Sequence, residues 1–162
     1  MRRDLFTKVR GTIMIAVLTL ITAGECLAQD SKGGGRLVGT WDTVVRIKNC
    51  MTGNVDNTFA SIGSFNQGGT SIGSTSGLPQ AGRTPEHGIW RHVDGNTYAM
   101  KFKTFSFNAM GQATGYAIIE HTLELDSSGD TYYSDGTAKF YLLNGTQVGQ
   151  GCSDADGTRM AF

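Results

Sequence analysis

The sequence of 162 residues lacks the short motifs that identify the common enzyme classes. It contains no G-x-S-x-G, no H-E-x-x-H, no phosphate-binding loop and no dinucleotide-binding glycine pattern. Each absence removes the sequence argument for one class: serine hydrolases, zinc peptidases, P-loop nucleotide-binding proteins and dinucleotide-dependent oxidoreductases. The sequence therefore says more about fold than about function.

The sequence also lacks an excess of either positive or negative charge. Lys and Arg number fourteen, and so do Asp and Glu. Four of the basic and two of the acidic residues lie in residues 1–28, which leaves a net charge near −2 for the rest, scattered without runs. This balance argues against nucleic acid or an anionic membrane surface as the main partner.

Long hydrophobic runs are lacking except for Ile13–Ala23, which is about half as long as a membrane-spanning helix requires. Four basic residues precede the run, and Cys26-Leu27-Ala28 follows it as a small-residue cleavage pattern. Residues 1–28 are thus predicted to be a signal peptide, with export to the periplasm or the medium and no stable membrane span. A lipoprotein anchored through Cys26 is the less favoured alternative, because Glu25 stands where that signal needs a small residue.

Cysteine is scarce, and only Cys50 and Cys152 remain after residue 28. In an oxidising compartment, an even pair is most simply one disulfide. The three histidines stand at no ligand-like spacing to these cysteines, so neither a metal site nor a cofactor is expected.

Proline and helical patterning are scarce too: the chain has two prolines, and no window carries an apolar stripe of 3.6-residue period over three turns. Short alternating runs rich in Thr, Val, Ile, Tyr and Phe are instead separated by glycine-containing turns. The fold class is therefore predicted to be all-β. The expected strands are 37–49, 56–66, 69–76, 87–94, 97–107, 113–126, 131–143 and 146–160.

Eight strands joined by short turns predict an antiparallel up-and-down meander that closes into a barrel. The single domain should span residues 37–162, after a flexible segment 29–36 without a 3₁₀ helix. Trp41, Thr43 and Val45 should share the inner face of the first strand, by period-2 alternation. Phe105 and Phe107 break the phase of the fifth strand, which predicts a β-bulge near residues 103–104. A two-sheet sandwich is the alternative architecture.

Gly39-Thr40-Trp41 resembles the G-x-W signature that opens lipocalins, fatty-acid-binding proteins and avidins, grouped as calycins. The resemblance implies that Trp41 plugs one end of the barrel and that Arg159, on the last strand, packs over it. The chain also resembles small exported bacterial barrel proteins, through this opening, the pairs Asn49-Cys50 and Gly151-Cys152, and the segment Thr84–Trp90. Both proposed ties, Trp41 with Arg159 and Cys50 with Cys152, require the first and last strands to be neighbours.

An eight-stranded barrel is either filled by side chains or holds one small ligand. Small residues in the second and third strands leave volume unfilled, so inward aromatic residues there would line an apolar pocket. The candidate ligand-binding residues are Phe59, Phe65, Trp90, Tyr98, Phe102, His121, Tyr132 and Phe140.

The long connection 77–86 and the strand that follows it hold further candidates, Arg83, Glu86 and His87. Glu86 and His87 could form a proton-transfer pair, because imidazole titrates near working pH. The alternative is that all three are solvated while Pro85 and Gly88 shape the entry to the strand. His121 falls on the core side by alternation and is either a structural histidine bonded to Tyr or Ser, or a polar group facing a ligand.

Three functions stay open at this point. The first is binding of a small, largely apolar molecule inside the barrel. The second is a cofactor-free cyclase or isomerase of the allene oxide cyclase type, with His121, His87 or Tyr98 moving a proton. The third is a filled barrel with a structural or interaction role. The sequence leaves the oligomeric state open.

Overall fold

The computed structural model describes residues 34–162, so the predicted signal peptide 1–28 lies outside the described residues. A short 3₁₀ helix, η1 (Gly34–Leu37), precedes eight strands, and a second one, η2 (Gln80–Gly82), lies between β3 and β4. The strands are β1 (Gly39–Lys48), β2 (Val55–Asn66), β3 (Thr70–Thr75), β4 (Glu86–Asp94), β5 (Thr97–Phe107), β6 (Ala113–Leu125), β7 (Thr131–Leu142) and β8 (Gln147–Arg159).

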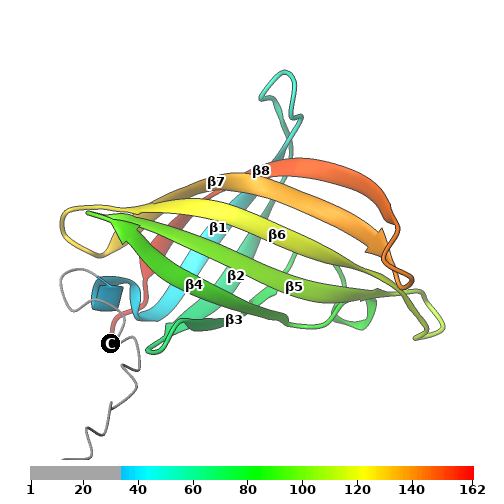
Figure 1. Cartoon of the computed structure of the whole chain (residues 1–162), viewed down its shortest axis with the longest axis horizontal. Coiled ribbons are helices and arrows are strands. Elements are labelled where there is room, and N and C mark those ends of the chain that lie inside the picture. Colours follow the sequence, from blue (N-terminus) through cyan, green and yellow to red (C-terminus); the bar gives the residue numbers. More distant parts are fainter. Residues whose placement is uncertain (1–33) are drawn as a thin grey trace, which may run out of the picture.

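The strands form a closed antiparallel barrel in the order β1 to β8, with β8 paired to β1 (Figure 1). This confirms the predicted up-and-down barrel and excludes the two-sheet sandwich. The expected strands agree with the observed ones to within two residues at each end. The architecture is consistent with a calycin-like fold, and closure removes the unpaired strand edges that an open sheet would expose.

The predicted bulge near residues 103–104 is wrong. Strand β5 pairs with β6 without a shift through Lys103 and Thr104, and the irregularity lies between Ser106 and Phe107. Phe105 faces outward, where its ring lies 6.3 Å from that of Tyr116 and 4.8 Å from Lys103 Nζ. An aromatic cluster on the outer face, rather than a change of register, therefore explains the apparent break in alternation.

The pairing of β1 with β8 is fastened at both ends. Cys50 and Cys152 form a disulfide across a sequence separation of 102, as predicted, just past the pairing of Lys48 with Cys152. At the other end Trp41 pairs with Arg159. Between them, on the outer face, Asp154 accepts ion pairs from Arg46 Nε at 2.5 Å and Lys48 Nζ at 2.8 Å. The first and last strands are thus neighbours, as both proposed ties required.

One end of the barrel is closed by a compact apolar core. Its members are buried aromatic and aliphatic side chains from η1 and six of the strands: Leu37, Trp41, Phe65, Trp90, Tyr98, Leu123, Leu125 and Tyr132. The Arg159 guanidinium lies 4.3 Å from the Trp41 ring centre and donates hydrogen bonds to the carbonyls of Arg36, Val38 and Gly129. The plug that the calycin resemblance implied is present.

A 3₁₀ helix precedes β1, so its expected absence is wrong. Of the predicted flexible segment 29–36, residues 29–33 lie outside the described residues and Gly34–Arg36 belong to η1. Arg36 holds η1 against two turns, since it donates to Asn96 Oδ1 at 2.7 Å and to the carbonyls of Asp126 and Ser127. These partners lie 60 to 91 positions away in the sequence. Patterns of neighbouring residues carry no information about such distant contacts.

Gly39 has a structural reason to be glycine. Its φ is +145°, and a Cβ atom there would lie 2.5 Å from Arg159 Nη1. The first position of the G-x-W signature therefore makes room for the guanidinium that covers Trp41.

Within residues 34–162, no helix has the length and apolar character needed to cross a membrane.

Candidate functional site

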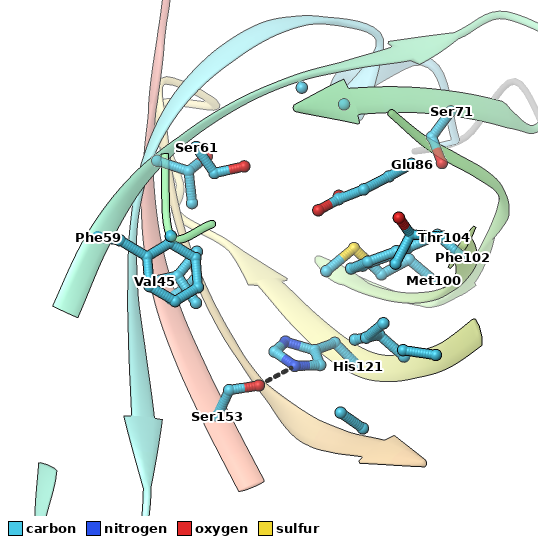
Figure 2. Close-up of a pocket in the computed structure, with 18 of the residues that line it drawn as sticks. Val45, Phe59, Ser61, Ser71, Glu86, Met100, Phe102, Thr104, His121 and Ser153 are labelled. Atoms are coloured by element: carbon cyan, nitrogen blue, oxygen red, sulfur yellow. Dashed lines mark hydrogen bonds between the residues drawn. The ribbon is translucent and has the colours of Figure 1, made fainter. Parts of the chain in front are cut away.

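A cavity of about 380 Å³ lies inside the barrel, next to the closed-end core. Phe65 and Tyr132 of that core line it, so the core forms its floor. The rest of its wall includes apolar side chains from β1, β2, β5 and β7, among them Val45, Ile47, Phe59, Met100, Phe102 and Phe140. Figure 2 shows Val45, Phe59, Met100 and Phe102 around this volume. The interior is therefore not filled by side chains along its whole length.

Small residues leave this volume open. Ser61 and Gly63 on β2, and Ser71 and Gly73 on β3, line the cavity at positions where larger side chains would fill it. Strand β3 is also the shortest of the eight, with six residues. The glycine- and serine-rich stretch of the sequence thus forms the thin side of the barrel.

The cavity reaches the surface at the end opposite the core. Leu78 and Phe140 line it and are still 52% and 44% exposed. Leu78 belongs to the long β3–β4 connection, and Gly77 beside it packs directly on the Phe59 ring, with no room for a Cβ. A ligand would therefore enter past this connection.

An ion pair stands in the cavity wall. Arg83, in the β3–β4 connection, donates from Nη2 to Glu86 Oε1 at 2.8 Å, and both side chains are largely buried. Burial raises the pKa of the Glu86 carboxyl, and the nearby Arg83 guanidinium opposes that shift. The interpretation of Arg83 and Glu86 as solvated is wrong.

His87 lies on the other face of the strand. Glu86 lines the cavity, whereas His87 is exposed, as expected for successive residues of β4. The predicted Glu86–His87 proton-transfer pair is therefore wrong, because adjacent strand residues point to opposite sides of a sheet.

His121 is buried and bonded to serine. Its Nδ1 lies 3.1 Å from Ser134 Oγ and its Nε2 lies 2.9 Å from Ser153 Oγ. Burial lowers the pKa of the imidazole to about 4, so the ring is neutral at pH 7, with one nitrogen donating and the other accepting. His121 lines the cavity, as does Ser153 (Figure 2), and both ring nitrogens are satisfied by side chains.

Three further inward hydroxyl groups are hydrogen-bonded within the protein. Tyr132 and Thr43 share a hydrogen bond of 2.9 Å between their hydroxyls on the cavity floor. Thr104 Oγ1 donates to the Thr84 carbonyl at 2.8 Å. These contacts leave the cavity with a mainly apolar lining and a few fixed polar positions.

Most of the predicted ligand-binding residues meet in this cavity: Phe59, Phe65, Phe102, His121, Tyr132 and Phe140, together with Arg83 and Glu86. Trp90 and Tyr98 do not line it. Trp90 donates from its indole to the carbonyls of Asn66 and Thr70, and Tyr98 is fully buried in the closed-end core. They stabilise the end of the barrel and have no contact with the interior volume.

Sequence reasoning missed several lining residues. Thr104 and Ser106 face inward on β5, where the expected bulge had reversed the alternation. Ala117 and Ser153 also line the cavity, and uninterrupted period-2 alternation along β6 and β8 could have found both.

Among residues 34–162, no group of three His, Cys, Asp or Glu side chains is arranged to hold a metal ion. The cavity's own polar groups, Arg83, Glu86 and the serine-bonded His121, are suited to hydrogen bonding.

Comparisons of the chain with protein-family models, with curated proteins and with solved structures each find no match.

Proposed function

We propose that this protein binds a small, largely apolar molecule inside its barrel. The observation that carries the proposal is the interior cavity of about 380 Å³, which falls in the size range of small-molecule sites. Its wall is mostly aliphatic and aromatic, and burying an apolar ligand against such a wall yields roughly 25 cal/mol per Å² of apolar surface removed from water.

The proposal includes export. The disulfide between Cys50 and Cys152 is compatible with an oxidising compartment, and residues 1–28 have the pattern of a signal peptide. A protein of this kind would hold its ligand in the periplasm or the medium, as a calycin-like carrier does.

The alternatives have less support. A filled barrel with a structural role does not account for the interior volume. For the cyclase alternative, His87 faces outward, Tyr98 lies in the closed-end core, and the nearest partners of His121 are two serines rather than a second titratable group. His87 and Tyr98 therefore do not line the cavity, and His121, which does, is bonded to serine hydroxyls there.

A fluorescence titration tests the binding function. N-phenyl-1-naphthylamine is an uncharged probe whose emission rises in apolar surroundings, and we expect saturable binding of one molecule per chain. In Ala138→Phe the added ring enters the cavity, because Ala138 lines it on β7, and affinity should fall at least tenfold.

Ala60→Phe is the matched control. Ala60 follows Phe59 on β2 and is exposed on the outer face, so the same substitution adds the same ring outside the cavity. Wild-type affinity is expected for this variant. Equal affinities for all three proteins would place the probe on the outer surface and contradict the proposal.

A further inference from the structure

The cavity contains one polar feature that its apolar lining does not explain, the Arg83–Glu86 pair. We infer that this pair is the polar anchor of the site, and that the ligand is an uncharged, largely apolar molecule carrying a hydroxyl group. The inference rests on the proposed binding function and names the class of ligand.

Half of the Glu86 carboxylate is engaged within the protein. Oε1 accepts from Arg83, whereas among residues 34–162 no donor bonds to Oε2. Figure 2 shows the carboxylate extending into the cavity, past Ser71 and toward the side where Ser61 lies. Oε2 lies across from Gly73, where even a Cβ atom would be only 3.1 Å from it. Glycine at this position leaves room for an oxygen that is directed into the cavity and open to a ligand donor.

The pair is held in place before any ligand arrives. Pro85 favours an extended Thr84, whose N–H donates to the Phe105 carbonyl at 3.0 Å. Arg83 forms a β-bridge with Ser106, so the connection is joined to β5 on one side while Glu86 pairs with Gly73 of β3 on the other. A preformed anchor of this kind loses little conformational entropy when it binds.

The charges of the pair select the ligand's head group. Arg83 and Glu86 together carry no net charge, so a ligand carboxylate would meet the like charge of Glu86, and an ammonium group would meet that of Arg83. A hydroxyl donates to Oε2 and brings no charge into a low-dielectric site. Hydrogen bonds to an ionised group are about twice as strong as neutral ones, so a hydroxyl gains a strong contact here without adding a charge to the site.

Four ligands of similar length test this selection by displacing N-phenyl-1-naphthylamine from the purified protein: 1-decanol, its isomer 1-methoxynonane, decanoate and decylammonium. The methyl ether keeps the acceptor oxygen but lacks the O–H donor. We expect 1-decanol to bind about tenfold more tightly than the ether, because it forms one additional hydrogen bond to a charged group. Decanoate and decylammonium should both bind more weakly than 1-decanol.

Glu86→Gln should reduce the preference for the alcohol over the ether to less than threefold and leave the affinity for the ether unchanged, which also shows that the cavity is intact. Glu124→Gln is the matched control, because Glu124 is exposed on the outer face of β6, and its alcohol preference should equal that of the wild type.

Three outcomes would overturn the anchor while leaving the binding function standing: equal affinities for alcohol and ether in the wild type, tightest binding of decanoate or decylammonium, or an alcohol preference that survives in Glu86→Gln. Absence of probe binding in the wild type would overturn the binding function itself, and the anchor with it.

Discussion

The disulfide between Cys50 and Cys152 offers the sharpest stability prediction. It closes a loop with a sequence separation of 102. In the chain-entropy model, a loop of that length restricts the unfolded state by about 4.7 kcal/mol at 25 °C. Cys50 is exposed and Cys152 only half-buried, so replacing both with serine removes little packing from the folded state. The double variant Cys50→Ser/Cys152→Ser should therefore lose about 3–5 kcal/mol of unfolding free energy.

Urea unfolding followed by tryptophan fluorescence measures this loss. The slope of unfolding free energy against urea should be steeper for the variant, because an unfolded chain without the crosslink exposes more surface. Wild-type protein treated with a reductant should behave like the variant. A loss below about 1 kcal/mol with an unchanged slope would show that the bridge does not restrict the unfolded chain as this reasoning requires.

Three further predictions concern the closed end and the buried histidine. Trp41→Ala should destabilise the protein by about 3–5 kcal/mol in urea unfolding, as a large-to-small change at a fully buried site, and a loss under about 1 kcal/mol would contradict its role as the plug. Gly39→Ala should cost about 1–3 kcal/mol through backbone strain and a clash with Arg159, whereas Gly35→Ala, with nothing within 4 Å of its added Cβ, should stay within about 0.5 kcal/mol of wild type. Burial lowers the pKa of His121 to about 4 from its ordinary 6.5, so the unfolded state takes up the proton first as pH falls. The stabilisation is complete above pH 6.5 and should decline by up to about 3 kcal/mol between pH 6.5 and 4. Unfolding curves across this range should show a weaker decline in His121→Gln, and an identical decline would assign the pH dependence to other groups.

The barrel was predictable because its signals are local. Turns such as Asn144-Gly145 mark where each strand ends, and period-2 alternation in β1 and β6 assigns Trp41, Thr43, His121 and Leu123 to the inside. The cysteine pair and the G-x-W resemblance then predict that the first and last strands are neighbours. These features depend on neighbouring residues or on one obvious partner.

The errors arose where distant contacts decide the structure. Phe105 resembles a core residue in the sequence, but it packs on the outer face against Tyr116 of the next strand. Residues 34–36 carry no pattern in the sequence that predicts a 3₁₀ helix, but Arg36 donates hydrogen bonds to turns 60 to 91 positions away. The division of the aromatic residues between cavity wall and closed-end core depends on height along the barrel, and alternation carries no information about height.

Glu86 illustrates the same limit within the candidate site. The sequence marked Arg83, Glu86 and His87 as an unusual cluster, but only the strand boundary at Glu86 determines which of them faces inward. A shift of this strand by one residue would move Glu86 to the outer face and break its buried ion pair with Arg83.

Native mass spectrometry of the protein isolated from its own host tests the central claim most directly. The wild-type chain should carry one small, uncharged molecule, which should be absent when Ala138→Phe is expressed in the same host and retained in Ala60→Phe. Detection of the unliganded chain alone in the wild type, or of the same bound species in Ala138→Phe, would contradict a binding function inside the barrel.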